Sequence, residues 1–340
     1  MRSPSWRGLA PLLALVIGSC APPPRAATTD VPIVRPSPPL ATPSGRASER
    51  AADAVVVVTL DGARWQDVFD RANMPYLADV ARTRGAAFGA PGFGEIRASG
   101  PNFVSLPGYT ELFTGRASHG CRDNDCPRVS IPTLADEVAA HGDGAAVFAS
   151  WECIDRAATA SAGQGQGVVV SAGQDGERMA PWPGDGEFRP DRFTARAALS
   201  YLEHRRPSFL FLGLGEPDEL AHRGDLPGYL GSLRAADAVV ADLFTVLARM
   251  GERGVRTAVF ITADHGRAQD FRNHGGAYPE SARVWLVAAG AGIRARGAAT
   301  AMGVRHLADV APTARALLGL PRDVAAGAGA PLAELLLDAE

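Results

Sequence analysis

The feature that most constrains the fold is a series of short apolar runs with helical patterns between them. Residues 54–60 read Ala-Val-Val-Val-Val-Thr-Leu, and continuous β-branched runs of this kind are typical of strands buried on both faces of a parallel sheet. Further runs are interpreted as strands at 145–149, 168–170, 208–214, 257–262 and 284–288. Helical patterns alternate with them at 74–84, 133–140, 193–204, 229–249 and 307–318. The alternation predicts an α/β fold, a doubly wound and mostly parallel sheet with helices on both faces.

Composition narrows the chemistry that this fold can carry. The chain has 340 residues, is 46% hydrophobic and has a formal net charge of −3, which suits an ordinary globular protein and argues against a general nucleic-acid-binding surface. All 34 basic residues are arginine, because the chain contains no lysine. Schiff-base catalysis, a pyridoxal-phosphate anchor and the lysine of a Walker loop are therefore excluded.

The N-terminus is interpreted as an export signal and not as part of the fold. An apolar run at residues 9–17 follows Arg2 and Arg7 and ends in Ile-Gly-Ser-Cys20, which resembles the lipobox of bacterial lipoproteins. We predict a signal peptide at 1–19 and a Pro-rich tether at 20–50 that starts at a lipid-modified Cys20; the alternative is an ordinary secretory signal with an incidental cysteine. Both interpretations export the protein, to the periplasm or cell envelope, and the first attaches it to a membrane through the lipid only.

The remaining chain is predicted to form one folded domain, at 51–325, followed by a C-terminal tail or helix at 326–340. A Gly-rich stretch at 161–188 is interpreted as a lid or an edge excursion. Cys121 and Cys126 flank a polar turn and are the predicted disulfide pair, which leaves Cys153 as the odd cysteine.

Acidic and imidazole side chains follow three of the predicted strands. Because doubly wound sheets place their sites beyond the carboxyl ends of the strands, we expect these side chains to lie together. Each one alone also suits a turn, a cap or a solvated helix face. Together they offer six ligands suited to two divalent ions. The six are Asp61, Asp218, His222, Asp264, His265 and His274.

A candidate nucleophile lies in the segment between the first two of these strands. Pro101 and Gly115 frame a short helix, and Ser105 is expected at or near its N-cap. An N-cap serine commonly only caps, but a nearby metal ion and the positive helix end would favour its alkoxide. The same helix end is expected to offer backbone N–H groups to a phosphate.

The order of these motifs resembles the alkaline phosphatase superfamily and is most similar to its nucleotide pyrophosphatase/phosphodiesterase branch. The resemblance covers residues 54–320 and rests on the Asp-Gly after the first strand, the Ser-x-Pro turn, Asp-x-x-x-His, Asp-His-Gly and a later His. It implies an alkaline phosphatase-like fold with a minimal cap. It also implies two metal sites, one formed by Asp218, His222 and His274. The other would be formed by Asp61, Asp264 and His265, with the Ser105 oxygen bridging towards it.

The same resemblance implies that Asn124, which follows a His119-Gly120 turn, helps to hold a phosphoryl oxygen, although a polar turn residue is an equal alternative. The predicted function is a metal-dependent phosphoric ester hydrolase, a phosphodiesterase or phosphomonoesterase, with two divalent ions that are predicted to be zinc. The predicted partner is a small-molecule phosphate ester.

Departures from the family pattern limit the substrate prediction, and the one at Tyr109 weighs against a sulfate ester. The nucleophile is Ser where the phosphodiesterases usually have Thr, and Tyr109 stands where sulfatases carry the Arg of Cys/Ser-x-Pro-x-Arg. The chain is also too short for the large second domain of cofactor-independent phosphoglycerate mutases. The alternatives are a catalytically degenerate metal- or ligand-binding envelope lipoprotein and a sulfatase-like hydrolase.

Overall fold

The computed structural model describes residues 50–90, 92–117, 120–161, 167–173 and 188–337. The expected signal peptide and the tether up to residue 49, with Cys20, lie outside the described residues, as does most of the Gly-rich stretch. Among the described residues, no helix combines the length and the apolar character needed to cross a membrane.

The central element is an eight-stranded sheet in the order β10-β2-β9-β7-β1-β6-β4-β5. All neighbouring strands pair in parallel except at β9, which runs antiparallel to both β7 and β2. A second sheet has the order β11-β3-β8. The strands are β1 (Ala54–Leu60), β2 (Gly85–Phe88), β3 (Ile96–Arg97), β4 (Ala145–Ala149), β5 (Val168–Ala172), β6 (Phe209–Leu214), β7 (Thr257–Thr262), β8 (Arg283–Val284), β9 (Leu286–Gly290), β10 (Gly297–Ala298) and β11 (Arg305–His306).

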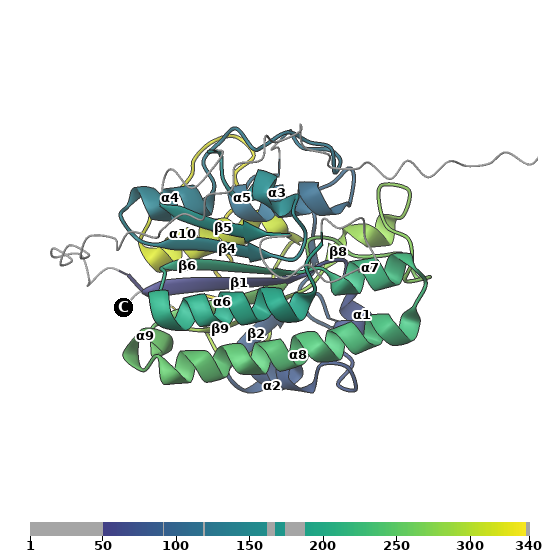
Figure 1. Cartoon of the computed structure of the whole chain (residues 1–340), viewed down its shortest axis with the longest axis horizontal. Coiled ribbons are helices and arrows are strands. Elements are labelled where there is room, and N and C mark those ends of the chain that lie inside the picture. The colour runs from purple at the N-terminus through teal and green to yellow at the C-terminus, as the bar shows by residue number, and fades with distance from the viewer. Residues whose placement is uncertain (1–49, 91, 118–119, 162–166, 174–187, 338–340) are drawn as a thin grey trace, which may run out of the picture. The chain divides into compact units, whose positions relative to one another are not determined.

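Helices cover both faces of the large sheet, as predicted (Figure 1). One layer contains α3, α4, α5 and α10, and the other contains α2, α6 and α8. The helices are α1 (Trp65–Val68), α2 (Pro75–Thr83), α3 (Ser105–Thr114), α4 (Leu134–Ala140), α5 (Ile154–Ala158), α6 (Asp191–Arg205), α7 (Glu216–His222), α8 (Leu226–Arg249), α9 (Glu252–Val255) and α10 (Val310–Leu318). Short 3₁₀ turns are formed by Pro279–Ala282 and Leu307–Asp309.

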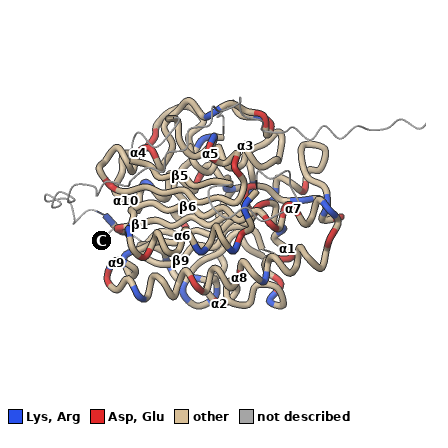
Figure 2. The backbone as a smooth tube through the Cα atoms, viewed as in Figure 1, with Lys and Arg blue, Asp and Glu red and all other residues tan. Residues whose placement is uncertain are grey.

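Strand β1 shows why the apolar runs form central strands. All seven of its residues are buried, and successive side chains of a strand point to opposite faces. Val55 and Val57 therefore join the core beneath α3 and α10, whereas Val56 and Val58 join the core beneath α8. The strands of the large sheet carry no charged residues, and the charges lie on the helices and in the connecting segments around it (Figure 2). Burial on two faces requires the unbroken apolar pattern that the sequence shows.

The strand predicted at 284–288 is present but is divided between two sheets, because the chain changes sheets at Trp285. Val284 belongs to β8 of the small sheet, and Leu286 begins β9 of the large one. Trp285 between them is fully buried, and its indole nitrogen donates to the Ala63 carbonyl at 2.9 Å. This anchor turns the chain from one sheet into the other.

The C-terminal segment, predicted as a tail or a helix, is irregular over residues 326–337. Leu332 and Leu335 are fully buried in the core, and the Leu332 amide donates to the Thr313 hydroxyl at 2.8 Å. The segment therefore packs on the same core as the elements before it. The expected minimal cap stays a prediction, because most of the stretch at 161–188 is not described.

Helix α3 packs against the sheet through aromatic contacts. Phe211 of β6 is 1% exposed, and its ring centroid lies 4.5 Å from that of Phe113 and 6.0 Å from that of Tyr109. We expect Phe211→Ala to lower the free energy of unfolding by about 3–5 kcal/mol, because it leaves a cavity and removes both ring contacts. Urea denaturation measures this loss. Val255→Ala, at a side chain that is 78% exposed, is the control and should change stability by no more than ~0.5 kcal/mol. Equal losses in the two variants would contradict the packing assignment.

Candidate metal centre and nucleophile

The predicted ligands lie at the carboxyl ends of three adjacent strands. Strand β1 is paired with β6 on one side and with β7 on the other. Asp61 directly follows β1, Asp264 follows β7 after one alanine, and Asp218 lies in α7 just after β6. Parallel pairing brings the three strand ends to the same edge of the sheet, and the three carboxylates with them.

One ligand group consists of Asp61, Asp264 and His265. The Nε2 atom of His265 lies 3.4 Å from Oδ1 of Asp61 and 3.4 Å from Oδ2 of Asp264. All three side chains are buried, and their ligand atoms lie within 4.8 Å of one another. The structure therefore brings together the three residues that were predicted for one metal site.

The second ligand group is built around Asp218. A carboxylate oxygen of Asp218 and nitrogens of His265 and His274 lie within 4.8 Å of one another. His222 joins them: its Nε2 atom is 3.2 Å from Asp218 Oδ2 and 2.9 Å from His274 Nε2. The predicted trio of Asp218, His222 and His274 is thus assembled, with the His222 side chain about half exposed. His265 adjoins both groups, and its ring stacks on that of His274 with centroids 4.0 Å apart.

Backbone carbonyls fix the orientation of two imidazoles. The Nδ1 atom of His265 is 2.9 Å from the Gly266 oxygen, and that of His274 is 2.9 Å from the Phe103 oxygen. Because a carbonyl oxygen only accepts, each Nδ1 carries a proton and donates it. This leaves each Nε2 as the atom that faces the carboxylates, which is the usual arrangement for a histidine that binds a metal.

The electrostatics of the group around Asp264 suit a divalent cation. Its Oδ2 atom is buried and has no hydrogen-bond partner among the residues that the structure describes. Burial and the neighbouring charge of Asp61 raise the pKa of Asp264 to about 8. Burial opposes the charged form of His265, yet the Asp264 and Asp61 carboxylates raise its pKa to about 9. A bound cation would stabilise the buried carboxylates, which lie close together, and would contact the carboxylate oxygen that lacks a hydrogen bond. The residues present therefore fit a metal ion.

Ser105 is the first residue of α3 and lies against this group. Its hydroxyl donates to Asp61 Oδ1 at 3.3 Å, and it also lies 3.3 Å from His265 Nε2. The N-cap is Val104 and not Ser105, so the serine hydroxyl does not cap the helix and points instead at the ligands. The expectation of a position at or near the N-cap holds to within one residue.

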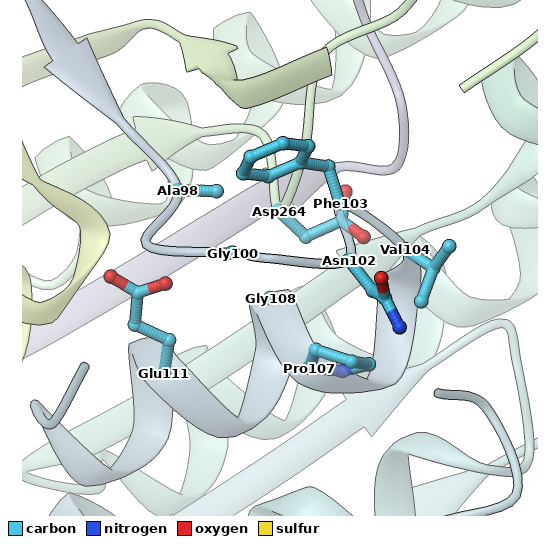
Figure 3. Close-up of a pocket in the computed structure, with 9 residues that line it drawn as sticks. All are labelled: Ala98, Gly100, Asn102, Phe103, Val104, Pro107, Gly108, Glu111 and Asp264. Atoms are coloured by element: carbon cyan, nitrogen blue, oxygen red, sulfur yellow. The ribbon is translucent and has the colours of Figure 1, made fainter. Parts of the chain in front are cut away.

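Gly108 allows α3 to approach the ligands closely. A Cβ atom at this position would lie 2.3 Å from the Asp264 carbonyl oxygen, well inside any normal contact. Figure 3 shows Gly108 on the side of α3 that is turned toward Asp264. The cavity left between this turn and the loop that contains Gly100 has a volume of about 10 Å³, which holds one water at most. It is therefore packing space and not a substrate pocket.

Asn124 is held beside the nucleophile by the helix end. Its Oδ1 atom accepts the Leu106 amide at 3.0 Å, which assigns its amide NH₂ as the donor group. The Leu106 amide therefore already has a partner in Asn124, and Pro107 has no backbone N–H. Of the backbone amides expected to bind a phosphate in this turn, the Ser105 amide is the one that is left. The predicted Cys121–Cys126 disulfide is present and closes the loop that carries Asn124. The expectation that Cys153 is the odd cysteine is wrong, because none of the described cysteines is free. His119 of the preceding turn lies outside the described residues.

Two residues that contact the ligands were not assigned a role from the sequence. The Tyr109 hydroxyl donates to Asp61 Oδ2 at 2.9 Å, and the Arg267 guanidinium forms an ion pair with Asp218. Both side chains are fully buried. Tyr109 lies one turn after Ser105 on α3, and Arg267 follows the Asp-His-Gly motif directly. Closeness in sequence to the motif residues was the only signal for either.

The family comparison matches the segment that carries most of these ligands. A profile described as the metalloenzyme superfamily matches residues 190–322. The chain is 27% identical over 274 residues to a 2,3-bisphosphoglycerate-independent phosphoglycerate mutase from Ruegeria sp. (strain TM1040), covering 78% of this chain and 51% of the mutase. It is 34% identical over 169 residues to a phosphopentomutase from Methylobacterium radiotolerans, covering 48% of this chain and 38% of that protein. The chain thus spans about half the length of these relatives or less.

Solved structures show the same fold over most of the chain. Wild-type alkaline phosphatase PafA superposes with a TM-score of 0.60 at 13% identity, covering 84% of this chain and 99% of that one. A 2-O GAG sulfatase superposes with a TM-score of 0.62 at 15% identity, covering 83% and 73%. These likenesses confirm the predicted fold, whereas the phosphodiesterase branch stays a prediction. The chain is thus similar to the metalloenzyme superfamily over residues 190–322 and has the fold of the alkaline phosphatase-like structures.

Proposed function

We propose that this protein is a phosphoric ester hydrolase that uses Ser105 as its nucleophile and binds two divalent metal ions, which we propose to be zinc. The observation that carries the proposal is the position of the Ser105 hydroxyl, 3.3 Å from both Asp61 Oδ1 and His265 Nε2. A serine that only began a helix would not need to face buried acids. Carboxylate and imidazole donors in this number suit zinc.

We assign the metal-binding roles as the sequence predicted them. Asp61, Asp264 and His265 would hold one ion, and Asp218, His222 and His274 the other. Bound divalent ions supply Lewis acidity, which favours an alkoxide and stabilises a leaving oxygen.

Ser105 Oγ forms a bond to phosphorus while the bond from phosphorus to the ester oxygen breaks, and the alcohol leaves with a proton. Water then attacks the phosphorylated serine, which restores the hydroxyl and releases phosphate from a monoester substrate or a phosphate monoester from a diester substrate. The Asn124 NH₂ and the Ser105 amide would donate to the non-bridging oxygens, where negative charge develops during the transfer.

The proposal extends to the location of the enzyme. The lipobox-like segment that ends at Cys20 supports an exported lipoprotein of the periplasm or cell envelope. A lipid at Cys20 would attach it to a membrane, and its substrate would be a small-molecule phosphate ester. The alternatives are a degenerate envelope protein that only binds metal or ligand, and a sulfatase-like hydrolase. Tyr109 at the position of the sulfatase Arg disfavours the second of these.

Replacement of the nucleophile separates catalysis from metal binding. We expect Ser105→Ala to lower kcat by at least about a thousandfold, because the covalent step is lost while the six other ligands stay in place. Metal content measured by mass spectrometry should remain two ions per chain. Turnover near the wild-type rate in this variant would rule out the covalent route.

The class of substrate is decided by a panel of p-nitrophenyl esters assayed after chelation and after addition of zinc. We expect turnover of a phosphate monoester, a phosphate diester or both, which disappears in the metal-free protein and returns with zinc, because the metal ions stabilise the transferring charge. Activity on the sulfate ester alone would favour the sulfatase alternative. Two bound zinc ions with no turnover of any ester would favour a binding protein.

The close approach of α3 is tested at Gly108. A methyl group here would meet the Asp264 carbonyl at 2.3 Å, so we expect Gly108→Ala to displace α3 and to lower kcat by about a hundredfold or more. Gly303→Ala is the matched control, since a Cβ there has no neighbour within 4 Å, and it should keep wild-type kcat. Full activity of Gly108→Ala would show that the helix does not need to lie this close.

A further inference from the structure

Arg267 is a charged side chain that is fully enclosed beside the metal centre. Its side chain has an exposed fraction of 0%. A guanidinium stays protonated under all ordinary conditions, and its burial is costly unless its donors are satisfied. The groups that satisfy it therefore show what it holds in place.

Its partners come from the three segments that carry ligands. Nε donates to the Gly62 oxygen at 3.0 Å, next to Asp61 in the chain, and Nη1 donates to the Arg272 oxygen at 2.7 Å, two residues before His274. Nη2 donates to the Asp218 carbonyl at 3.2 Å and also to Oδ1 of the same residue. The planar guanidinium of Arg267 thus links the ends of β1 and β6 to the loop after β7 through its hydrogen bonds.

The atoms packed around the Arg267 guanidinium restrict its position. Gly62 has a φ of +58°, and a Cβ atom there would lie 2.5 Å from Asp218 Oδ1 and 2.8 Å from Arg267 Nε. Only glycine fits at this point, both for its backbone conformation and for the close approach. The carboxylate of Asp218 is therefore confined between the guanidinium and the imidazoles of His222 and His274, which lie 3.2 Å and 3.7 Å from its oxygens.

We propose that Arg267 is a positioning residue of the metal centre, which fixes the Asp218 carboxylate and holds the three ligand-bearing segments together. The inference rests on the proposed function, because it concerns the metal ion that Asp218 would bind. Arg267 itself is neither a ligand nor a group that meets the substrate. Partners that orient a metal ligand typically contribute 10–100-fold to metal affinity. The fork geometry matters as well as the charge, since a lysine has neither the planar shape nor the spread of donors.

The test is a zinc titration of the full chain against a competing chelator, with Arg267→Met, Arg267→Lys and Asp218→Asn compared with wild type. Asp218→Asn identifies which of the two dissociation constants belongs to the Asp218 site. We expect both Arg267 variants to weaken that constant by about 10–100-fold. Arg315→Met is the matched control, because Arg315 is equally buried and pairs with Glu137 at 2.6 Å away from the site. It should lower the unfolding temperature and leave both zinc constants within about threefold of wild type, a margin set well below the expected effect.

Each outcome bears on the inference. An unchanged zinc constant in Arg267→Met, or wild-type affinity in Arg267→Lys, overturns the positioning role. Equal weakening in Arg315→Met overturns it too, since the effect would then come from general destabilisation. If Arg267→Met does not fold, as judged by circular dichroism, Arg267→Lys and its zinc constant decide the question. A wild-type chain that binds no zinc defeats the proposed function itself, whereas two bound ions with indifferent Arg267 variants defeat this inference alone.

Discussion

Parallel pairing of β1 with β6 and β7 is the constraint on which the rest of the site depends. The strands are far apart in the chain, yet their carboxyl ends meet at one edge because they run in the same direction. Each of these ends delivers one acidic group: Asp61, Asp218 or Asp264. The apolar strands contribute the free energy of burial, and the polar groups just beyond them are assembled by that same pairing.

Three carboxylates in one buried region cost free energy unless positive charge accompanies them. Two side chains that can carry positive charge lie next to these carboxylates. His265 stands between Asp61 and Asp264, and Arg267 contacts Asp218. Among the described residues, Oδ2 of Asp264 still has no hydrogen-bond partner, and the nearest cationic group is the His265 imidazole at 3.4 Å. The charge that the protein itself supplies is thus incomplete at that point, which is the physical reason why a metal ion suits this arrangement.

The nucleophile is brought in by a separate element whose position depends on packing. Phe113 of α3 packs against Phe211 of the sheet with its ring tilted, and Gly108 lets the helix backbone approach the Asp264 carbonyl. Ser105, at the start of the same helix, then faces the ligands. Stability and site geometry are coupled here, because the contacts that bury α3 also set the distance between its hydroxyl and the metal ligands.

The sequence by itself determined the fold class, most of the central strands and the residue types at their ends. It did so because a strand buried on two faces needs an unbroken apolar run, and because site residues follow such runs directly. It did not reveal that the chain changes sheets at Trp285. It also did not reveal that Tyr109 and Arg267 support Asp61 and Asp218. Only the tertiary structure decided these points, since the direction of a strand and the partner of a buried donor depend on segments distant in the chain. Local pattern carries no information about such contacts.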